Sequence, residues 1–124
     1  MKTLTITRPD DWHTRVRNGT ILKTVLPHTA RQFARAIIMP NLKPPVTTVA
    51  QALAYREEIL QAVPAGVDFT PLMTLYLTGS TTKTEIKKAV DSDPIYAFKL
   101  YPAGATTNSD SGVADIKSIY PLLA

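Results

Sequence analysis

Four short runs of apolar or β-branched residues recur along this chain, and each is separated from the next by a segment with helical spacing. Pro, Gly, Asn or Asp bounds each run, as is usual for strands. The runs comprise residues 11–16, 34–39, 69–77 and 95–101. The helical segments lie at 20–33, 48–66 and 82–90, and a further helical pattern starts at Val113. This alternation predicts parallel strands joined by crossover helices, the α/β class.

Two of the predicted helices begin with a capping box. In Thr48-Val49-Ala50-Gln51 the threonine hydroxyl and the glutamine side chain can each bind an N–H group that the first turn leaves unpaired. Thr82-Lys83-Thr84-Glu85 has the same form. Pro27 interrupts the segment at 20–33. Since proline has no N–H, we expect regular helix to begin near Pro27 rather than to run through it.

The number of βα units leaves two architectures open. Four units make half of a (β/α)8 (TIM) barrel, a fold that usually takes about 250 residues. A length of 124 residues would by itself favour a small, open, doubly wound sheet. Val113, Ile116 and Tyr120 have helical spacing, but the helix that they predict has no last turn before Ala124. We therefore expect residues 1–124 to be one domain, the truncated N-terminal half of a barrel with about the first four βα units.

The composition and charge narrow the function classes. Lys and Arg number 14 and Asp and Glu 10, but the basic residues are scattered, which argues against a nucleic-acid interface. The chain has no cysteine, so disulfides, thiolate metal sites and a cysteine nucleophile are excluded. No segment of the sequence has the ~20 consecutive apolar residues of a membrane helix, and the N-terminus does not resemble a signal peptide. We expect a cytoplasmic protein that binds neither nucleic acid nor membrane.

Strand periodicity groups several polar side chains on one face of the sheet, because residues i and i+2 of a strand point the same way. On the first predicted strand, His13 and Arg15 share a face with Asp11. Asn41 follows the second strand and would share its inner face if the strand stays regular through Pro40. Each position also has a plain structural interpretation. A single histidine is often a hydrogen-bonded structural residue, and asparagine is a favoured turn residue.

The fourth predicted strand carries a lysine in an unusual position. The bulky residues of this strand should meet the helices; they are Tyr96, Phe98 and Leu100. The opposite face, with Ile95, Ala97 and Lys99, would then point towards the barrel axis. Lysine is almost never fully buried unless it is paired. Lys99 therefore either has a functional partner at the C-terminal mouth of the barrel or extends into solvent from an exposed strand end.

Four longer motifs resemble those of a single enzyme family. They are residues 8–13 (RPDDWH), 39–46 (MPNLKPPV), 69–74 (FTPLMT) and 99–109 (KLYPAGATTNS). In this order and spacing they resemble the bacterial-type dihydroorotases of the amidohydrolase superfamily, and the likeness covers essentially the whole chain. Four long motifs in the correct order are far more specific than a lone short pattern.

The resemblance implies a (β/α)8 barrel that reversibly cyclises N-carbamoyl-aspartate to dihydroorotate in de novo pyrimidine biosynthesis. In the family, two zinc ions activate a hydroxide that attacks the cyclic amide. His13 matches a zinc ligand on the first strand, and Lys99 matches the lysine that is carboxylated and bridges the metals. The substrate-binding residues that the resemblance implies are Arg17, Asn41, Thr106 and Thr107, of which the two threonines belong to a mobile loop that covers the substrate.

The sequence departs from the family pattern at its first strand. Arg15 replaces the second histidine of a His-x-His pair, and Asn18 replaces the aspartate that follows Arg17 in the family. A guanidinium has no lone pair to give, and about 4 Å from zinc it would be repelled by ~4 kcal/mol for each unit of like charge at an effective dielectric of about 20. His13 and His28 are the only histidines of the chain, so the ligands from later strands are absent. We expect a fragment that is inactive alone and that self-associates or pairs with a complementing half-barrel; a non-catalytic scaffold subunit is the alternative.

Overall fold

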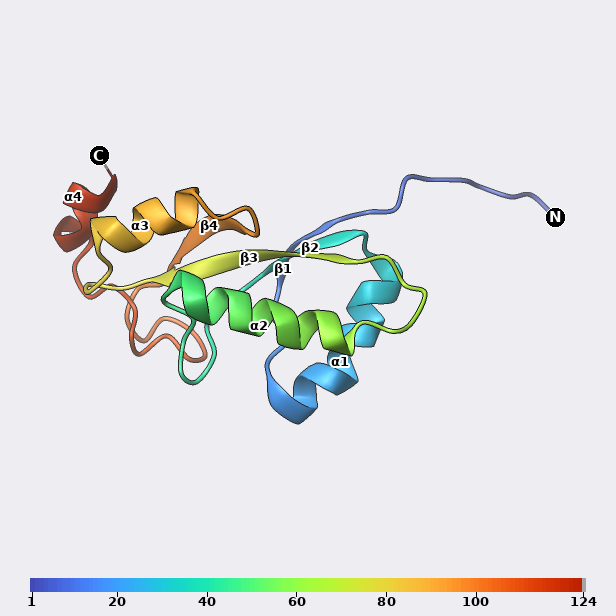
Figure 1. Ribbon diagram of the computed structural model, residues 1–124, viewed down its shortest axis with the longest axis horizontal. Coiled ribbons are helices and arrows are strands. Elements are labelled where there is room, and N and C mark those ends of the chain that lie inside the picture. The colour runs from blue at the N-terminus through green and yellow to red at the C-terminus, as the bar shows by residue number, and fades with distance from the viewer. Residues whose placement is uncertain (124) are drawn as a thin grey trace.

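The computed structural model describes residues 1–123, which form one parallel sheet with helices packed on it (Figure 1). The strands are β1 (Asp11–Thr14), β2 (Arg35–Ile38), β3 (Thr70–Leu77) and β4 (Ile95–Leu100). The helices are α1 (Gly19–Gln32), α2 (Val49–Ala62), α3 (Lys83–Val90), the 3-10 helix η1 (Ile116–Ile119) and α4 (Tyr120–Leu123). The predicted alternation of strands and helices is confirmed. No helix within residues 1–123 combines the length and the apolar character needed to cross a membrane.

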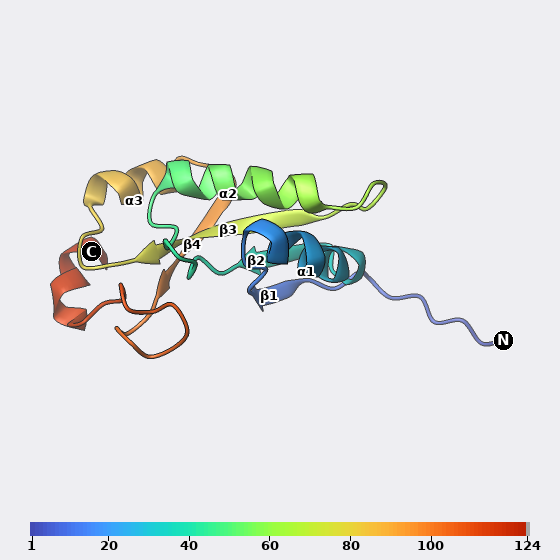
Figure 2. The same ribbon diagram turned by 90° about the horizontal axis from the view of Figure 1, so that it is seen from below.

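The strand order decides between the two architectures. The order is β1-β2-β3-β4, and every neighbouring pair is parallel. In a doubly wound sheet the strand order reverses at a switch point and helices cover both faces. Here the order follows the chain, and α2 and α3 lie on the same side of β3 (Figure 2). Buried residues of α1, α2 and α3 also belong to one core cluster with residues of the sheet. The structure is therefore a partial (β/α)8 barrel, and the open doubly wound sheet is wrong.

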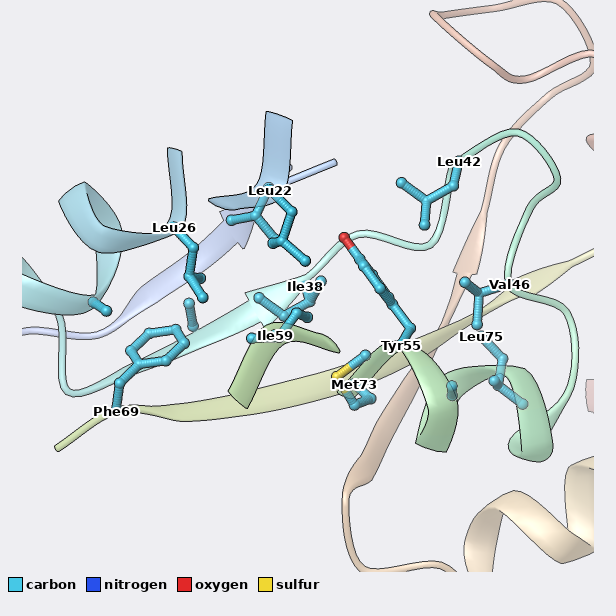
Figure 3. Packing of buried hydrophobic residues seen from close by; sticks show 14 of the residues in the cluster. Leu22, Leu26, Ile38, Leu42, Val46, Tyr55, Ile59, Phe69, Met73 and Leu75 are labelled. Atoms are coloured by element: carbon cyan, nitrogen blue, oxygen red, sulfur yellow. The ribbon is translucent and has the colours of Figure 1, made fainter. Parts of the chain in front are cut away.

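The main core lies between the helices and one face of the sheet (Figure 3). Leu26 of α1 and Ile59 of α2 are fully excluded from solvent, as is Leu75 of β3. Burying a side chain of this size stabilises a fold by about 1.5–3 kcal/mol. A smaller cluster holds the C-terminal segment to the sheet through Val113 and Ile119. Apolar burial on this one face thus fixes where the carboxyl ends of the strands lie.

Helix α1 runs through Pro27, so the expectation that regular helix begins near that residue is wrong. Proline removes one helical hydrogen bond and crowds the preceding turn. Leu22 and Leu26, which precede Pro27, are both buried in the core, and their burial offsets that cost. Gly19 starts the helix with a φ of 57°, a left-handed conformation that glycine adopts without strain.

The two predicted capping boxes differ in the structure. The box at α2 is complete, because Thr48 accepts from the backbone N–H of Gln51 and the Gln51 side chain accepts in return from that of Thr48. At α3, Thr82 Oγ1 accepts from the backbone N–H of Glu85 at 3.2 Å. The Glu85 carboxylate, however, accepts from the backbone N–H of Val49 at 2.6 Å. The second box is therefore half formed, and its acidic residue caps the neighbouring helix instead.

Strand β4 departs from regular alternation at its start. The pairing of β3 with β4 skips one residue, Tyr96. A bulge of this kind shifts the side-chain alternation on one side of it. Ile95 consequently packs against the helix-side core, and the prediction that it shares a face with Lys99 is wrong. Of the bulky residues expected to meet the helices, Phe98 packs against the core, whereas Tyr96 and Leu100 are exposed.

Strand β1 is shorter and less regular than predicted. It ends at Thr14 rather than at Val16, which is buried in the core. Its register with β2 shifts between Asp11 and Thr14, so the simple alternation that placed Asp11 on the face of His13 is interrupted. A short edge strand with a bulge is common in sheets.

Candidate functional site

The carboxyl ends of the strands bring several of the predicted residues to one end of the sheet. Arg15 directly follows β1, Asn41 follows β2, and Lys99 lies near the end of β4. His13 precedes Arg15 by two residues within β1. In βα barrels the carboxyl end of the strands is the end that carries active sites. The positions selected from the sequence therefore meet where a barrel builds a site.

Asn41 joins three segments of this end of the sheet. Its side chain is buried, with 1% of the residue exposed. Its Oδ1 accepts from Nε of Arg15 at 3.3 Å and from the hydroxyl of Tyr101 at 3.0 Å. Its Nδ2 donates to the carbonyl of Thr107 at 2.9 Å, and its own carbonyl accepts from Nδ2 of Asn108 at 3.3 Å. Asn41 is therefore more than a turn residue. Its hydrogen bonds connect Arg15, Tyr101 at the end of β4 and the loop that follows β4.

Positive charge gathers around His13. Nζ of Lys99 lies 5.4 Å from the ring centroid of Tyr101, within the range of a cation–π contact. Partial desolvation lowers the pKa of His13, and the charges of Lys99 and Arg15 lower it further against the opposing effect of Asp11. The imidazole is therefore held in its neutral form at neutral pH.

Two tyrosines stack beside these charges. The ring centroids of Tyr76 and Tyr101 lie 5.1 Å apart. Burial raises the pKa of both hydroxyls, and the charge of Arg15 partly offsets the effect for Tyr101. Within residues 1–123 the buried hydroxyl of Tyr76 has no hydrogen-bond partner. An unpaired buried hydroxyl costs about 1–3 kcal/mol, so the burial of the Tyr76 hydroxyl is unfavourable.

The loop after β4 is folded back on itself. Ser109 is fully buried; its hydroxyl donates to the carbonyl of Thr106 at 2.6 Å and accepts from the Thr106 N–H at 2.8 Å. A Cβ atom on Gly112 would collide with the carbonyl oxygen of Tyr101, so glycine is required there. The side chains of Thr106 and Thr107 are exposed, and the loop is attached to the rest of the site through the contact of the Thr107 carbonyl with Asn41.

The Arg17 side chain makes no hydrogen bond to this cluster within residues 1–123. Its φ of 60° places the backbone in the left-handed region, where the chain turns from β1 into α1. Its carbonyl accepts from the hydroxyl of Tyr55 at 2.5 Å. Among residues 1–123, the arginine that contacts Asn41 is Arg15 and not Arg17. The hydrogen bond to Asn41 thus comes from Arg15, and a shared pocket for Arg17 and Asn41 stays a prediction.

The side chains at this end of the sheet do not fit zinc. Zinc takes neutral imidazoles, thiolates and carboxylates as ligands. The charged neighbours of His13 include two cations, Arg15 and Lys99, and a guanidinium has no lone pair. In the part of the chain that the structure describes, no three His, Cys, Asp or Glu side chains gather in a way that could hold a metal ion. His13 and Lys99 alone do not make a metal centre.

Sequence reasoning missed Tyr101, Asn108 and Ser109. Tyr101 had a usable signal, because it follows Lys99 by two residues and therefore falls on the same face of an extended strand. Asn108 has a φ of 57°, a conformation that asparagine tolerates better than most residues. A fully buried serine inside a polar loop leaves no signal in the sequence, since its burial depends on how the loop folds.

Curated relatives match nearly the whole chain, although no family model matches it. The dihydroorotase of Leptothrix cholodnii is 68% identical over 121 residues, which cover 98% of this chain and 35% of that protein. The dihydroorotase of Alkalilimnicola ehrlichii is 64% identical over 124 residues, which cover 100% of this chain and 36% of that protein. The chain thus spans about a third of the length of the curated relatives that it matches.

Solved structures give the same result. The crystal structure of dihydroorotase from Campylobacter jejuni superposes with a TM-score of 0.84 at 41% identity, over 94% of this chain and 34% of that chain. The Saccharomyces cerevisiae dihydroorotase in complex with 5-fluoroorotic acid gives a TM-score of 0.83 at 36% identity, over 92% of this chain and 31% of that chain. Sequence and fold agree over almost all of the described residues. The chain therefore belongs to the dihydroorotase family, in which it corresponds to an N-terminal portion.

Proposed function

We propose that residues 1–124 are the N-terminal half of a cytoplasmic dihydroorotase-like barrel and that this half does not catalyse the family reaction alone. That reaction is the reversible cyclisation of N-carbamoyl-aspartate to dihydroorotate, so the substrate is a small carboxylated molecule. The observation that carries the proposal is the meeting of Arg15, Asn41 and Tyr101 in one hydrogen-bonded group at the carboxyl ends of the strands. Identity of 68% to a curated dihydroorotase supports it.

The substrate-holding residues in this proposal are those that the family resemblance implies. Arg17 binds a substrate carboxylate, a task that suits a guanidinium because its two parallel N–H groups match two oxygens. Asn41 supports the same pocket, and its Nδ2 already attaches the loop at Thr107. Thr106 and Thr107 close over the substrate from that loop. The hydrogen bond from Asn41 to the Thr107 carbonyl supports a loop whose position depends on whether the pocket holds substrate.

The ligand set of this half supports the proposal that it is inactive alone. His13 and Lys99 are the two residues that match metal ligands of the family, and Arg15 occupies the position of a third. Zinc at this end of the sheet would need donors from outside residues 1–124, and it would need Arg15 to be replaced or displaced. We expect such donors to come from a complementing half-barrel.

A zinc titration of two variants tests the role of Arg15. Arg15→His restores two imidazoles at positions i and i+2 of the first strand, removes a like charge and adds a ligand, so calorimetry should show tighter zinc binding than for the unmodified chain. Lys23→His adds an imidazole at an exposed position of α1, with no histidine three or four residues away, and is the matched control, for which we expect no change. Equal zinc affinity in the unmodified chain and the Arg15→His variant would show that Arg15 does not block a site.

Complementation tests the proposed half-barrel. The C-terminal portion of a related full-length dihydroorotase is added in trans, and hydrolysis of dihydroorotate is followed. We expect turnover with Arg15→His and none with the unmodified chain. Turnover by the complemented, unmodified chain would place Arg15 outside the metal site and contradict the proposed roles.

The alternative is a non-catalytic dihydroorotase-like subunit that supports a partner enzyme. The arginine at a ligand position favours it, because this substitution removes a metal ligand while the apolar core remains intact. If the two halves associate and the Arg15→His form binds zinc but still shows no turnover, the scaffold role is the better description.

A further inference from the structure

Asn18 is directly followed by Gly19 at the start of α1, and both residues are exposed. Asn18 occupies the N-cap position, but its side chain makes no hydrogen bond to the first turn of the helix. Gly19 has a φ of 57°, and a Cβ atom added to it would contact nothing within 4 Å. The space beside Gly19 is therefore open, and no capping bond fixes the Asn18 amide in place.

The backbone nitrogen of Gly19 lies next to this amide and is itself unpaired in the described part of the chain. Gly19 is the first residue of α1, and the N–H groups of a first turn have no partner within their own helix. The carbonyl of Asn18 accepts one backbone hydrogen bond, from the Leu22 N–H at 3.4 Å, which is longer than usual. A rotation about the Cα–C bond of Asn18 can therefore bring the Gly19 nitrogen onto Cγ at little cost. The positive end of the helix dipole favours loss of the proton from this nitrogen, which makes it nucleophilic.

We propose that Asn18 is a site of spontaneous deamidation, which converts a neutral helix cap into an acidic one. The deprotonated Gly19 nitrogen attacks Cγ of Asn18, a bond between these two atoms forms, and the bond from Cγ to Nδ2 breaks. Nδ2 takes up a proton and leaves as ammonia. Water then opens the resulting cyclic imide at either of its carbonyl groups, which gives aspartate or isoaspartate. Water is the only co-reactant, and proximity within the chain replaces a catalyst.

The aspartyl product changes the electrostatics of α1. The first turn of this helix contains no acidic residue, and a negative charge near a helix N-terminus is stabilising. The same product restores the Arg-Asp sequence from which the chain departs at Arg17-Asn18. The isoaspartyl product instead adds a methylene group to the main chain and should loosen the first turn. This inference goes beyond the proposed function and does not depend on it, because it requires neither zinc nor turnover.

Ageing of the folded chain in mildly alkaline buffer, followed by peptide mass spectrometry, tests the site. The chain has three asparagines, and two of them are internal controls: Asn41 is buried and precedes Leu42, and the side chain of Asn108 donates to the Asn41 carbonyl. We expect Asn18 to convert about tenfold faster than either control, with the mass change of an NH2-to-OH exchange. In mildly acidic buffer the conversion should be slower, because the Gly19 nitrogen keeps its proton.

Two outcomes would overturn the inference: conversion at Asn41 or Asn108 as fast as at Asn18, and conversion at Asn18 that occurs in urea but not in the folded chain. Asn18→Gln is the matched control, because its longer side chain closes a ring less readily, and it should stay unconverted. Asn18→Asp reproduces the aspartyl product and should have a higher thermal midpoint than Asn18→Gln. An equal or lower midpoint would contradict the proposed effect on α1. Failure of the zinc and complementation experiments would leave these tests unaffected.

Discussion

The two faces of the sheet are held in place by different forces. On the helix-covered face, side chains such as Leu26, Ile59 and Leu75 are fully buried, and each contacts several others without a required direction. On the opposite face, one buried amide, that of Asn41, binds Arg15, Tyr101 and the loop after β4 through directed hydrogen bonds. Many residues thus stabilise the helix-covered face, whereas the contacts among Arg15, Tyr101 and the loop after β4 depend on the side chain of Asn41.

Because of this difference, a substitution on the helix-covered face should mainly lower the free energy of unfolding, whereas loss of the Asn41 amide should mainly change how neighbouring segments are positioned. Removing one apolar side chain costs free energy, but its many neighbours keep the architecture. Removing the amide of Asn41 leaves three segments without their common contact, since a hydrogen bond is lost when either partner is lost. Variants on the two faces should therefore differ in what they change as well as in how much.

The largest effect is expected in the core. Ile59→Ala creates a cavity on the helix-covered face and should lower the free energy of unfolding by roughly 2–5 kcal/mol, as measured by urea denaturation. Leu53→Ala is the control on the same helix, because Leu53 is 41% exposed. We expect a much smaller loss for that variant. Equal losses for the two would mean that the helix-covered face is not packed as described.

Asn41→Ala tests the polar face and should lower the free energy of unfolding by about 1–3 kcal/mol. It should also release the loop at 102–112, so limited proteolysis under native conditions should cleave this loop faster than in Ile59→Ala. Asn18→Ala is the control, because Asn18 is exposed and makes no side-chain capping bond. Unchanged loop cleavage in Asn41→Ala would show that the loop is held by its internal contacts alone.

A pair of tyrosine variants should give effects of opposite sign. Tyr76→Phe removes a buried hydroxyl that has no partner within residues 1–123, and it should raise the free energy of unfolding by about 1 kcal/mol. Tyr101→Phe removes a hydroxyl that donates to Asn41 and should lower it. Thermal denaturation of both variants measures the difference. A loss of stability in Tyr76→Phe would imply that its hydroxyl is bound.

The smallest effect is expected at the ion pair between Arg35 and Asp10. The hydrogen bond from Arg35 lowers the pKa of Asp10 below its usual value of 3.8. A carboxyl group whose pKa is lower in the folded state stabilises the fold above its unfolded pKa and loses that contribution as the pH falls. The thermal midpoint of the unmodified chain should therefore fall slightly more than that of Asp10→Asn between about pH 5 and about pH 2. Parallel curves for the two chains would mean that the ion pair contributes nothing measurable.

Much of the fold could be predicted from the sequence, because its determinants are local. The alternation of apolar runs and helical spacing, and the capping box at Thr48, depend on residues close together in the chain. The passage of α1 through Pro27 and the bulge at Tyr96 could not be predicted in this way. They depend on packing against distant elements, which a local pattern does not contain.

The candidate site shows the same division. Lys99 and Asn41 could be selected because strand periodicity and order place them at the carboxyl ends of parallel strands. The pairing of Asn41 with Arg15 joins residues 26 positions apart, and the contact of Asn41 with Tyr101 joins residues 60 positions apart. Such partners follow from the three-dimensional arrangement of the loops. The sequence could therefore indicate the members of the site but not their hydrogen-bond partners.

Because the Val49 N–H donates a hydrogen bond to the Glu85 carboxylate, one βα unit of the chain depends on the next for its stability. The N-terminus of α2 is completed by a side chain that comes 36 residues later, from the following unit. A chain cut between α2 and α3 would leave this amide without its acceptor, and loss of α3 would weaken the first turn of α2. We therefore expect the amide protons at the start of α2 and those of α3 to exchange with solvent as one cooperative group rather than unit by unit.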